Sequence, residues 1–247
     1  MLRVRNLSVG FGAEPVLEGI DLEVKAGEFA SLIGPSGSGK TSILRAVTHL
    51  LEPLSGSAEV DVSPQDIGFL FQDDALLPWR TARQNVALGL RIRGSEIKDA
   101  EEIAQQWLAR LGLERLGDRY PRQLSGGQRK RVAIAQVLAL QPKLLLMDEP
   151  FASLDAIVRT RITQELLDWV EREHLTVLLV THDLEEAISV SDVVYVLSQG
   201  PRATIRARHP VSIARPRNVL GTRRDPLFGP LLKRLWDELS AESPSLA

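Results

Sequence analysis

Apolar and polar residues alternate at the start of the chain. Both Leu2–Val9 and Val16–Val24 show this alternation, which is typical of strands that bury only one face. The short apolar run Phe29–Ile33 then leads into a glycine-rich loop. In Lys40–Leu51 the apolar residues recur at the i, i+3, i+4 and i+7 spacing of a helix. The pattern therefore predicts two half-buried strands, followed by a strand, a loop and a helix.

The middle of the chain has helical periodicity, and the last third returns to short apolar runs separated by helical segments. Helices are predicted over Ala100–Leu111 and Gln128–Leu140, within a helical region from about Asn85 to Gln141. Strands are predicted at Ile67–Phe71, Leu144–Met147, Thr176–Val180 and Val193–Leu197, and further helices at Ala156–Glu173 and Leu184–Ser189. Apolar runs that alternate with helices are typical of a mostly parallel sheet covered on both faces. We therefore expect an α/β core interrupted by a helical insertion.

The length and composition exclude several classes of protein. The chain has 247 residues, of which 44% are hydrophobic, and no apolar run approaches the ~18–20 residues that cross a bilayer. A membrane-spanning channel or permease is therefore excluded. Without an apolar secretory signal at the N-terminus, we expect the chain in the cytosol. Because the chain has no cysteine, a disulfide scaffold, a thiolate metal site and a cysteine nucleophile are excluded.

Charge is distributed unevenly along a chain whose formal net charge is −2. Residues 201–247 contain nine Lys/Arg and four Asp/Glu, so a basic tail follows an acidic body. Such a tail fits a solvated surface segment, or contact with a membrane surface, nucleic acid or an acidic partner. A dedicated DNA-binding protein has a larger and more clustered basic excess, so we expect no nucleic-acid partner.

Residues 34–41 fit the pattern G-x-x-x-x-G-K-[ST], between a predicted strand and a predicted helix. They are Gly34, Pro35, Ser36, Gly37, Ser38, Gly39, Lys40 and Thr41. Glycines let the backbone curl so that successive N–H groups point at a phosphate, and the following helix adds the positive end of its dipole. Lys40 can then reach the β- and γ-phosphates, and the Thr41 hydroxyl can ligate Mg²⁺. The loop predicts that the chain binds a nucleoside triphosphate.

Two acidic residues follow the apolar run Leu144–Met147. Ligands of open α/β sheets bind outside the carboxyl ends of the strands, so Asp148 and Glu149 should lie at the same edge as residues 34–41. Asp148 suits a Mg²⁺ ion, and Glu149 can accept a proton from the water that attacks the γ-phosphate. The alternative for Glu149 is a cap on the next turn. His182 ends a third strand at this edge, where it would face the γ-phosphate.

A second glycine motif precedes a helix that is predicted to begin near Arg129. It consists of Leu124, Ser125, Gly126, Gly127 and Gln128. A serine hydroxyl and open backbone N–H groups at a helix N-terminus form a second anion-binding arrangement. Two such loops, far apart in one sequence, suggest a head-to-tail pair of chains, with each ATP between the first loop of one and the second loop of the other.

Together these motifs resemble the ATP-binding cassette (ABC) family from Leu2 to about Leu197. GPSGSGKT, LSGGQ, LLLMDE, the SLD triplet at Ser153–Asp155 and His182 occur in that family's order. The resemblance implies an α/β P-loop NTPase fold: a RecA-like core with a mostly parallel sheet, an antiparallel N-terminal β part and an inserted helical subdomain. We expect the ABC ATPase domain in residues 1–220, with its core in 1–84 and 142–220 and its helical subdomain in about 85–141. A short helical tail would follow in residues 221–247.

The resemblance also implies functions for individual residues. It assigns Mg²⁺ ligation to Thr41 and Gln72, the general base to Glu149 and the sensing of the γ-phosphate to His182. In an ATP-sandwich dimer, Asp155 would contact the first phosphate loop of the partner subunit. Phe11 lies where the family places an aromatic residue against adenine, although a phenylalanine instead of a tyrosine departs from the family pattern.

Two segments resemble the importer ATPases of the nitrate, sulfonate and taurine group: Asp73–Trp79, and Met147–Asp155. The tail, with Arg215–Arg217 and Asp225-Pro226, resembles the same group. Such an ATPase is peripheral at the cytoplasmic face of the inner membrane. It drives a separate permease, which a periplasmic or lipoprotein solute-binding protein supplies with cargo. The permease would contact Leu76, Leu77, Pro78 and Trp79, unless these residues pack internally.

Two other functions are compatible with the same motifs. An importer ATPase for a thiamine precursor, a phosphonate or an amino acid would carry them too, because the ATPase never touches the cargo. A soluble, non-transport ABC ATPase that acts on DNA or ribosomes should have two cassettes or a long coiled-coil insertion. This chain has one cassette and no sustained heptads.

The tail is predicted to end in an amphipathic helix with two apolar rails at i, i+4 spacing. One rail is Phe228, Leu232 and Trp236, and the other is Leu227, Leu231, Leu235 and Leu239. Such a helix can lie on a membrane surface or pack on its own core, and we favour packing on the core.

Overall fold

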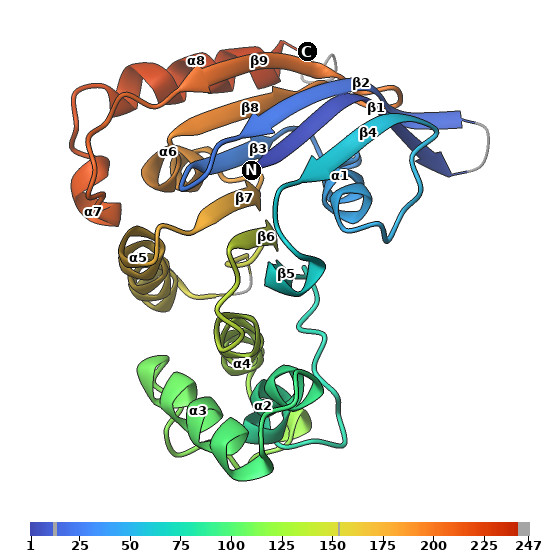
Figure 1. The fold of residues 1–247 in the computed structure, drawn as a ribbon. Coiled ribbons are helices and arrows are strands. Elements are labelled where there is room, and N and C mark those ends of the chain that lie inside the picture. Colours follow the sequence, from blue (N-terminus) through green and yellow to red (C-terminus); the bar gives the residue numbers. More distant parts are fainter. Residues whose placement is uncertain (12–13, 153, 242–247) are drawn as a thin grey trace.

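The structure is a computed structural model that describes residues 1–11, 14–152 and 154–241 (Figure 1). Its centre is a six-stranded sheet in the order β5-β6-β7-β3-β8-β9. The strands are β5 (Ile67–Leu70), β6 (Leu144–Asp148), β7 (Thr176–Val180), β3 (Phe29–Ile33), β8 (Val193–Leu197) and β9 (Ile205–Pro210). The neighbours from β5 to β8 pair in parallel, and β9 pairs antiparallel with β8. The predicted mostly parallel sheet is confirmed.

A second sheet lies at the N-terminal end of the chain, in the order β2-β1-β4. Its strands are β1 (Leu2–Phe11), β2 (Glu14–Val24) and β4 (Ser55–Val60), and both pairs are antiparallel. The antiparallel β part was predicted, but β4 and β9 were not. Neither strand has a buried apolar run: β4 begins with Ser55-Gly56-Ser57, and the burial of β9 is at most intermediate along its length.

The buried strands divide their side chains between two faces of the central sheet. In β6, Leu144 and Leu146 face the cluster formed with β1, β2 and α1 (Lys40–Val47), whereas Leu145 and Met147 face the opposite cluster. That opposite cluster contains α4 (Gly126–Leu138) and α5 (Ala156–Arg172). Residues of a strand alternate between faces, so an uninterrupted apolar run buries both sides.

The helical region forms the lower part of the molecule in Figure 1. It contains α2 (Ala82–Ile92) and α3 (Ile97–Arg110), which pack against α4, and α4 also contacts β5. Short 3₁₀ turns span Pro64–Asp66 and Pro121–Gln123. The helix α1 ends at Val47, short of the predicted Leu51, because His49 adopts a left-handed backbone with φ 55°.

The tail packs on the core. After α6 (Leu184–Val190) come α7 (Val219–Thr222) and α8 (Phe228–Ser240), and α8 packs against α6. The inward face of α8 takes residues from both predicted rails, with Phe228 and Leu235 buried, whereas Trp236 is 65% exposed. Part of the basic charge is used internally, since the buried Arg217 pairs with Asp192 at 3.1 Å.

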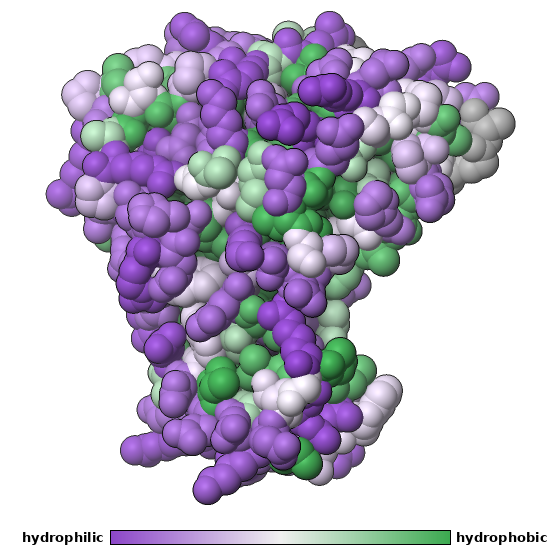
Figure 2. All heavy atoms as spheres, in the orientation of Figure 1, coloured by the Kyte–Doolittle hydropathy of each residue, from purple (hydrophilic) through white to green (hydrophobic). Residues whose placement is uncertain are grey.

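No helix in the described part of the chain has the length and apolar character needed to cross a membrane. The face drawn in Figure 2 is mostly hydrophilic, and its hydrophobic residues gather in small groups.

The strand order positions the site. Because β7 lies between β3 and β6 and all three run in parallel, their carboxyl ends meet at one edge of the sheet. The loop after Ile33, the acidic end of β6 at Asp148 and the residues after Val180 are therefore neighbours.

Candidate nucleotide-binding site

The loop between β3 and α1 depends on its glycines. Gly37 and Gly39 have left-handed backbones, with φ of 78° and 91°. A Cβ added at Gly39 would lie 2.9 Å from side-chain atoms of Val16 and Leu17, and one at Gly34 would lie 2.9 Å from the Cβ of Leu197. The loop therefore curls tightly into the N-terminus of α1, where backbone N–H groups are available for an anion.

Lys40 is the first residue of α1 and is buried. Its Nζ donates hydrogen bonds to the carbonyl oxygens of Gly34 at 2.9 Å and Pro35 at 2.8 Å. Burial lowers the pKa of Lys40, and the carboxylates of Glu149 and Asp148 oppose that effect. In this loop the Ser38 hydroxyl is buried without a hydrogen-bond partner. A lysine and a spare hydroxyl beside open N–H groups form a donor set that fits a polyphosphate.

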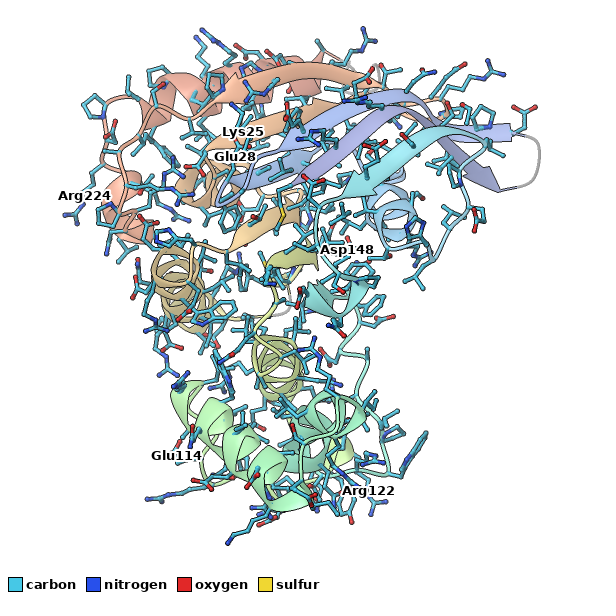
Figure 3. The ribbon with its side chains drawn as sticks, viewed as in Figure 1. Lys25, Glu28, Glu114, Arg122, Asp148 and Arg224 are labelled. Carbon is cyan, nitrogen blue, oxygen red and sulfur yellow. The ribbon has the colours of Figure 1, made fainter. Side chains whose placement is uncertain are left out.

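Asp148 lies in the interior at the end of β6 (Figure 3) and is 3% exposed. Burial raises the pKa of its carboxyl, while a hydrogen bond with the Thr41 side chain lowers it. The two side chains therefore present adjacent oxygen atoms. Mg²⁺ binds through few protein oxygens plus phosphate and water, so this donor set fits that ion. No larger cluster of His, Cys, Asp and Glu with metal-ligand geometry occurs among the residues described.

The backbone leaves the extended strand conformation at Glu149. Its backbone has φ 45°, and its N–H donates to the carbonyl oxygen of Val180 at 2.9 Å. Its Oε1 lies 3.1 Å from Nδ1 of His182, which is 60% exposed. The ends of β6 and β7 thus bring the predicted base and the predicted sensor together.

The second glycine motif begins a helix earlier than predicted. Helix α4 begins at Gly126, not near Arg129, because Ser125 is its N-cap and forms a capping box with Gln128. The Ser125 hydroxyl accepts from the Gln128 N–H at 3.3 Å, and the Ser125 N–H donates to the Gln128 side chain at 2.9 Å. Such a box satisfies helix N–H groups that have no backbone partner.

The two glycines of this motif are not required by the packing of this chain. Neither Gly126 nor Gly127 has a positive φ, and an added Cβ would approach no atom closer than 3.7 Å and 3.5 Å, respectively. The helix α4 packs among α2, α3 and β5, whereas α1 with the first loop packs against β1, β4 and β6 (Figure 1). The two glycine loops therefore belong to different parts of the chain.

The remaining predicted residues are placed as follows. Asp155 is the N-cap of α5 and accepts from the Val158 N–H at 3.0 Å. The exposed Gln72 follows β5. Phe11 is the last residue of β1, but its side chain lies outside the described part of the structure, as does Ser153.

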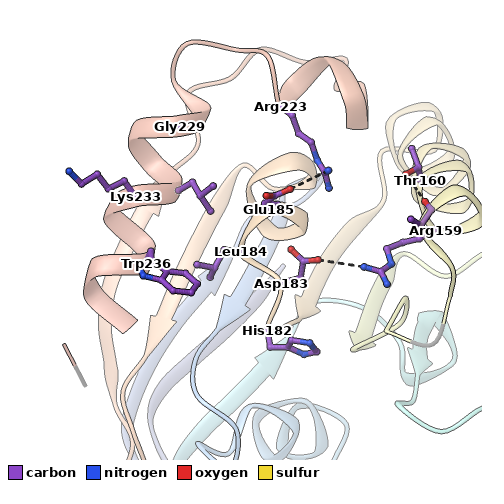
Figure 4. Close-up of a pocket in the computed structure, with 12 residues that line it drawn as sticks. Arg159, Thr160, His182, Asp183, Leu184, Glu185, Arg223, Gly229, Lys233 and Trp236 are labelled. Carbon is purple, nitrogen blue, oxygen red and sulfur yellow. Dashed lines mark hydrogen bonds and ion pairs between the residues drawn. The ribbon is translucent and has the colours of Figure 1, made fainter. Parts of the chain in front are cut away.

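Sequence reasoning missed the polar residues around His182. Asp183 is the N-cap of α6 and accepts from the Glu186 N–H at 3.0 Å, and its carboxylate lies 3.7 Å from Arg159 (Figure 4). Burial raises the pKa of Glu186 to about 7, against a hydrogen bond with Thr181. An open pocket of about 830 Å³ lies beside them, lined also by Trp236 of α8. Acidic residues at a helix start are common caps, so no sequence signal distinguishes these from ordinary caps.

A glycine loop between β3 and α1, with carboxylates at the end of β6, defines a nucleotide-binding protein of the P-loop class. The family model for the ABC transporter matches residues 17–152. The chain therefore belongs to the ABC transporter family, as one of its ATP-binding subunits. The predicted family, fold class and ATPase class are confirmed.

Several relatives are named for import. The chain is 46% identical over 205 residues to the sulfate/thiosulfate import ATP-binding protein CysA of Synechocystis sp., covering 80% of this chain and 58% of the relative. It is 41% identical to the taurine import ATP-binding protein TauB of Escherichia coli (strain K12), covering 87% of this chain and 86% of that protein. The aliphatic sulfonates import ATP-binding protein SsuB 1 of Paracoccus denitrificans is 41% identical, covering 97% and 94%.

A solved structure has the same fold. It is a dimeric post-hydrolysis state of the ATP-binding cassette MJ0796, bound to ADP and Pi. The TM-score is 0.78 at 32% sequence identity, and the match covers 87% of this chain and 100% of that chain.

Proposed function

We propose that this chain is the ATP-hydrolysing subunit of an importer for a small oxyanion of the sulfonate, taurine or sulfate type. The observation that carries the hydrolytic part is the meeting of Lys40, Asp148, Glu149 and His182 at one edge of the sheet. The import names of relatives 41–46% identical support the transport part and this class of cargo.

The phosphate loop binds the triphosphate of ATP. Backbone N–H groups of residues 34–41 face the phosphates, and the Lys40 ammonium exchanges the carbonyl oxygens of Gly34 and Pro35 for phosphate oxygens. The exchange is favourable because a charged donor binds an anionic oxygen more strongly than a neutral carbonyl. Phe11 stacks on the adenine.

Thr41, Asp148 and Gln72 would hold Mg²⁺, which would neutralise charge on the β- and γ-phosphates. Glu149 accepts the proton of the attacking water, and its left-handed backbone keeps the carboxylate at the strand end. His182, 3.1 Å from Glu149, orients that carboxylate and donates to the γ-phosphate. These are the catalytic residues of the proposed reaction.

A second copy of the chain completes each site. Ser125, Gly126, Gly127 and Gln128 contact the γ-phosphate of ATP bound to the partner subunit, and Asp155 contacts the partner's phosphate loop. Two observations support this arrangement: glycines that the chain's own packing does not need, and the likeness to a dimeric cassette. Binding of two ATP molecules closes the dimer, and hydrolysis reopens it.

The permease contacts the loop between β5 and α2. Leu76 packs partly against the helical core, as the alternative of internal packing requires, whereas Trp79 is 70% exposed. We therefore assign the contact chiefly to Pro78 and Trp79, which lie near the end of core segment 1–84. The helical subdomain of about residues 85–141 follows, and core segment 142–220 comes after it. The chain then lies at the cytoplasmic face of the membrane, and a solute-binding protein delivers the cargo to the permease.

Growth of a deletion strain on single sulfur sources tests the proposal. Taurine, longer alkanesulfonates and sulfate are compared, with the intact gene and an E149Q gene as complements. We expect loss of growth on one source, restored by the intact gene and not by E149Q. Normal growth on every source would contradict this class of cargo. Restoration by E149Q would show that hydrolysis does not drive uptake.

A further inference from the structure

Lys130 is a buried cation that the proposed hydrolysis does not use. It lies in the second turn of α4 and is 1% exposed. Its Nζ donates to the carbonyl oxygens of Phe71 at 2.8 Å and Gln72 at 2.9 Å. Among the residues described, the other buried lysine is Lys40, which belongs to the phosphate loop.

A buried ammonium carries a large desolvation cost unless its surroundings compensate for the lost water. Burial accordingly lowers the pKa of Lys130, and the carboxylates of Asp74, Asp148 and Asp73 oppose that effect. Both hydrogen bonds go to backbone carbonyls of one loop. The Lys130 ammonium therefore stabilises the backbone conformation of this loop and does not depend on the identity of its side chains. A cation in this position is therefore suited to hold the backbone of residues 71–72 against α4.

Two further side chains, those of Arg129 and Asn85, also form hydrogen bonds with this loop. Arg129, also on α4, donates from Nε to Oδ2 of Asp74 at 3.1 Å. At the other end, the fully buried Asn85 of α2 accepts from the N–H of Leu77 at 2.7 Å and donates to the carbonyl oxygen of Arg80 at 3.1 Å. Residues 71–80, here called the glutamine loop, are therefore fixed to α4 at one end and to α2 at the other.

We propose that Lys130 is a positioning residue that fastens Gln72 to the first turns of α4, so that the glutamine loop and the Ser125–Gln128 motif move as one body. The consequence for catalysis rests on the proposed function. Gln72 serves the ATP bound to its own chain, whereas Ser125–Gln128 serves the ATP bound to the partner. Lys130 then couples the two ATP sites through one side chain, and Trp79 of the same loop extends the coupling to the permease.

Hydrogen–deuterium exchange of the nucleotide-free chain tests the clamp directly. In K130M the apolar stem remains, but two loop carbonyls lose a charged donor, which should favour opening of the loop. We expect amides in residues 71–80 to exchange at least about fivefold faster than in the wild type, with little change in β3 and β7. Unchanged exchange in residues 71–80 would overturn the proposal.

K143M is the matched control. Lys143 lies just before β6 and pairs with Asp66 at 3.0 Å, but its side chain is 66% exposed. Both variants lose one ammonium group and its positive charge. The group is buried at Lys130 and exposed to water at Lys143. We expect K143M to exchange like the wild type, and equal acceleration in both variants would contradict a specific clamp.

ATP turnover supplies a second measurement. We expect K130M to lower kcat about tenfold or more while the ATP concentration for half-saturation changes little, because the phosphate loop is intact. In K130Q an uncharged amide, one atom shorter, replaces the ammonium, and we expect intermediate exchange and turnover. If K130M does not fold, K130Q provides the test. Exchange in K130Q equal to that of the wild type would then overturn the proposal that the ammonium is needed. A wild type without turnover would contradict the proposed function alone, because the exchange experiment does not need hydrolysis.

Discussion

Glu149 has an uncommon backbone conformation at the end of a buried strand. A non-glycine residue at φ 45° costs on the order of 1 kcal/mol or more, and the surrounding structure must hold it there. Here the hydrogen bond from its N–H to Val180 fixes the backbone, and His182 lies beside the carboxylate. Strain of this kind, together with a nearby imidazole, suits a residue that acts on a substrate.

E149Q should lower ATP turnover by at least ~10²-fold, because an amide cannot accept the proton of the attacking water. Nucleotide binding should remain, since Glu149 is not part of the phosphate loop. Steady-state hydrolysis and equilibrium binding of a fluorescent ATP analogue measure the two properties. As a contrast, Lys40→Ala should weaken nucleotide binding itself. Full turnover in E149Q would remove Glu149 from the position of base.

Glu186 makes the stability of the chain depend on pH. Its pKa is about 7 in the folded chain, against 4.5 for an ordinary glutamate, because burial disfavours the carboxylate. The charged groups around it are Asp183 on α6, Arg159 on α5 and His182. Since the folded pKa is raised, its contribution to stability is fully present below pH 4.5 and is lost as the pH rises through about 7.

Relative to E186Q, the wild type should therefore lose up to about 3 kcal/mol of unfolding free energy between pH 4.5 and pH 8. Urea unfolding of both chains at several pH values measures the difference, and contributions of groups common to both cancel. A difference that is constant with pH would show that Glu186 does not titrate in this window.

Packing positions the amphipathic helix α8 of the tail. Its buried face contacts α6, and a hydrogen bond of 2.9 Å between Nε2 of His209 on β9 and the Glu238 carboxylate on α8 adds a polar contact. Apolar residues that could have lain on a membrane instead cover Ala187 and Ile188 of α6.

Leu235→Ala should destabilise the chain by about 2–4 kcal/mol, because the fully buried side chain leaves a cavity between α8 and α6. Trp236→Ala is the control, with an effect within about 0.5 kcal/mol, since its side chain is 65% exposed. Urea denaturation measures both. Equal effects would mean that α8 does not pack through Leu235.

The two glycine loops lie in different parts of one chain, and in the proposed dimer each ATP site takes one loop from each subunit. The fold of the monomer tolerates side chains at the second loop, because Gly126 has room for a Cβ and no positive φ. A substitution there can therefore separate assembly from folding.

Gly126→Asp in an E149Q background should leave the unfolding free energy within about 0.5 kcal/mol and abolish ATP-dependent dimers, because its carboxylate would face the triphosphate. Gly229→Asp in α8 adds the same charge where an added Cβ also meets nothing within 4 Å, and it should still dimerise. Sedimentation velocity with and without ATP distinguishes the two. Dimers of the Gly126→Asp chain would contradict the proposed sandwich.

Sequence patterns predict the central strands, the phosphate loop and the meeting of Asp148, Glu149 and His182. These features follow from local signals, since buried parallel strands are continuous apolar runs and parallel strands end at one edge. Positive-φ glycines and a lysine at the start of a helix likewise specify the phosphate loop locally.

The remaining features depend on contacts that form in the folded chain. The strands β4 and β9 lack an apolar run, and the start of α4 depends on a capping box. Lys130 and Glu186 are ordinary charged residues in the sequence, and their properties arise from burial in the folded chain. The free energy of a charge is set by the groups packed around it, and a linear pattern of residues does not contain those neighbours.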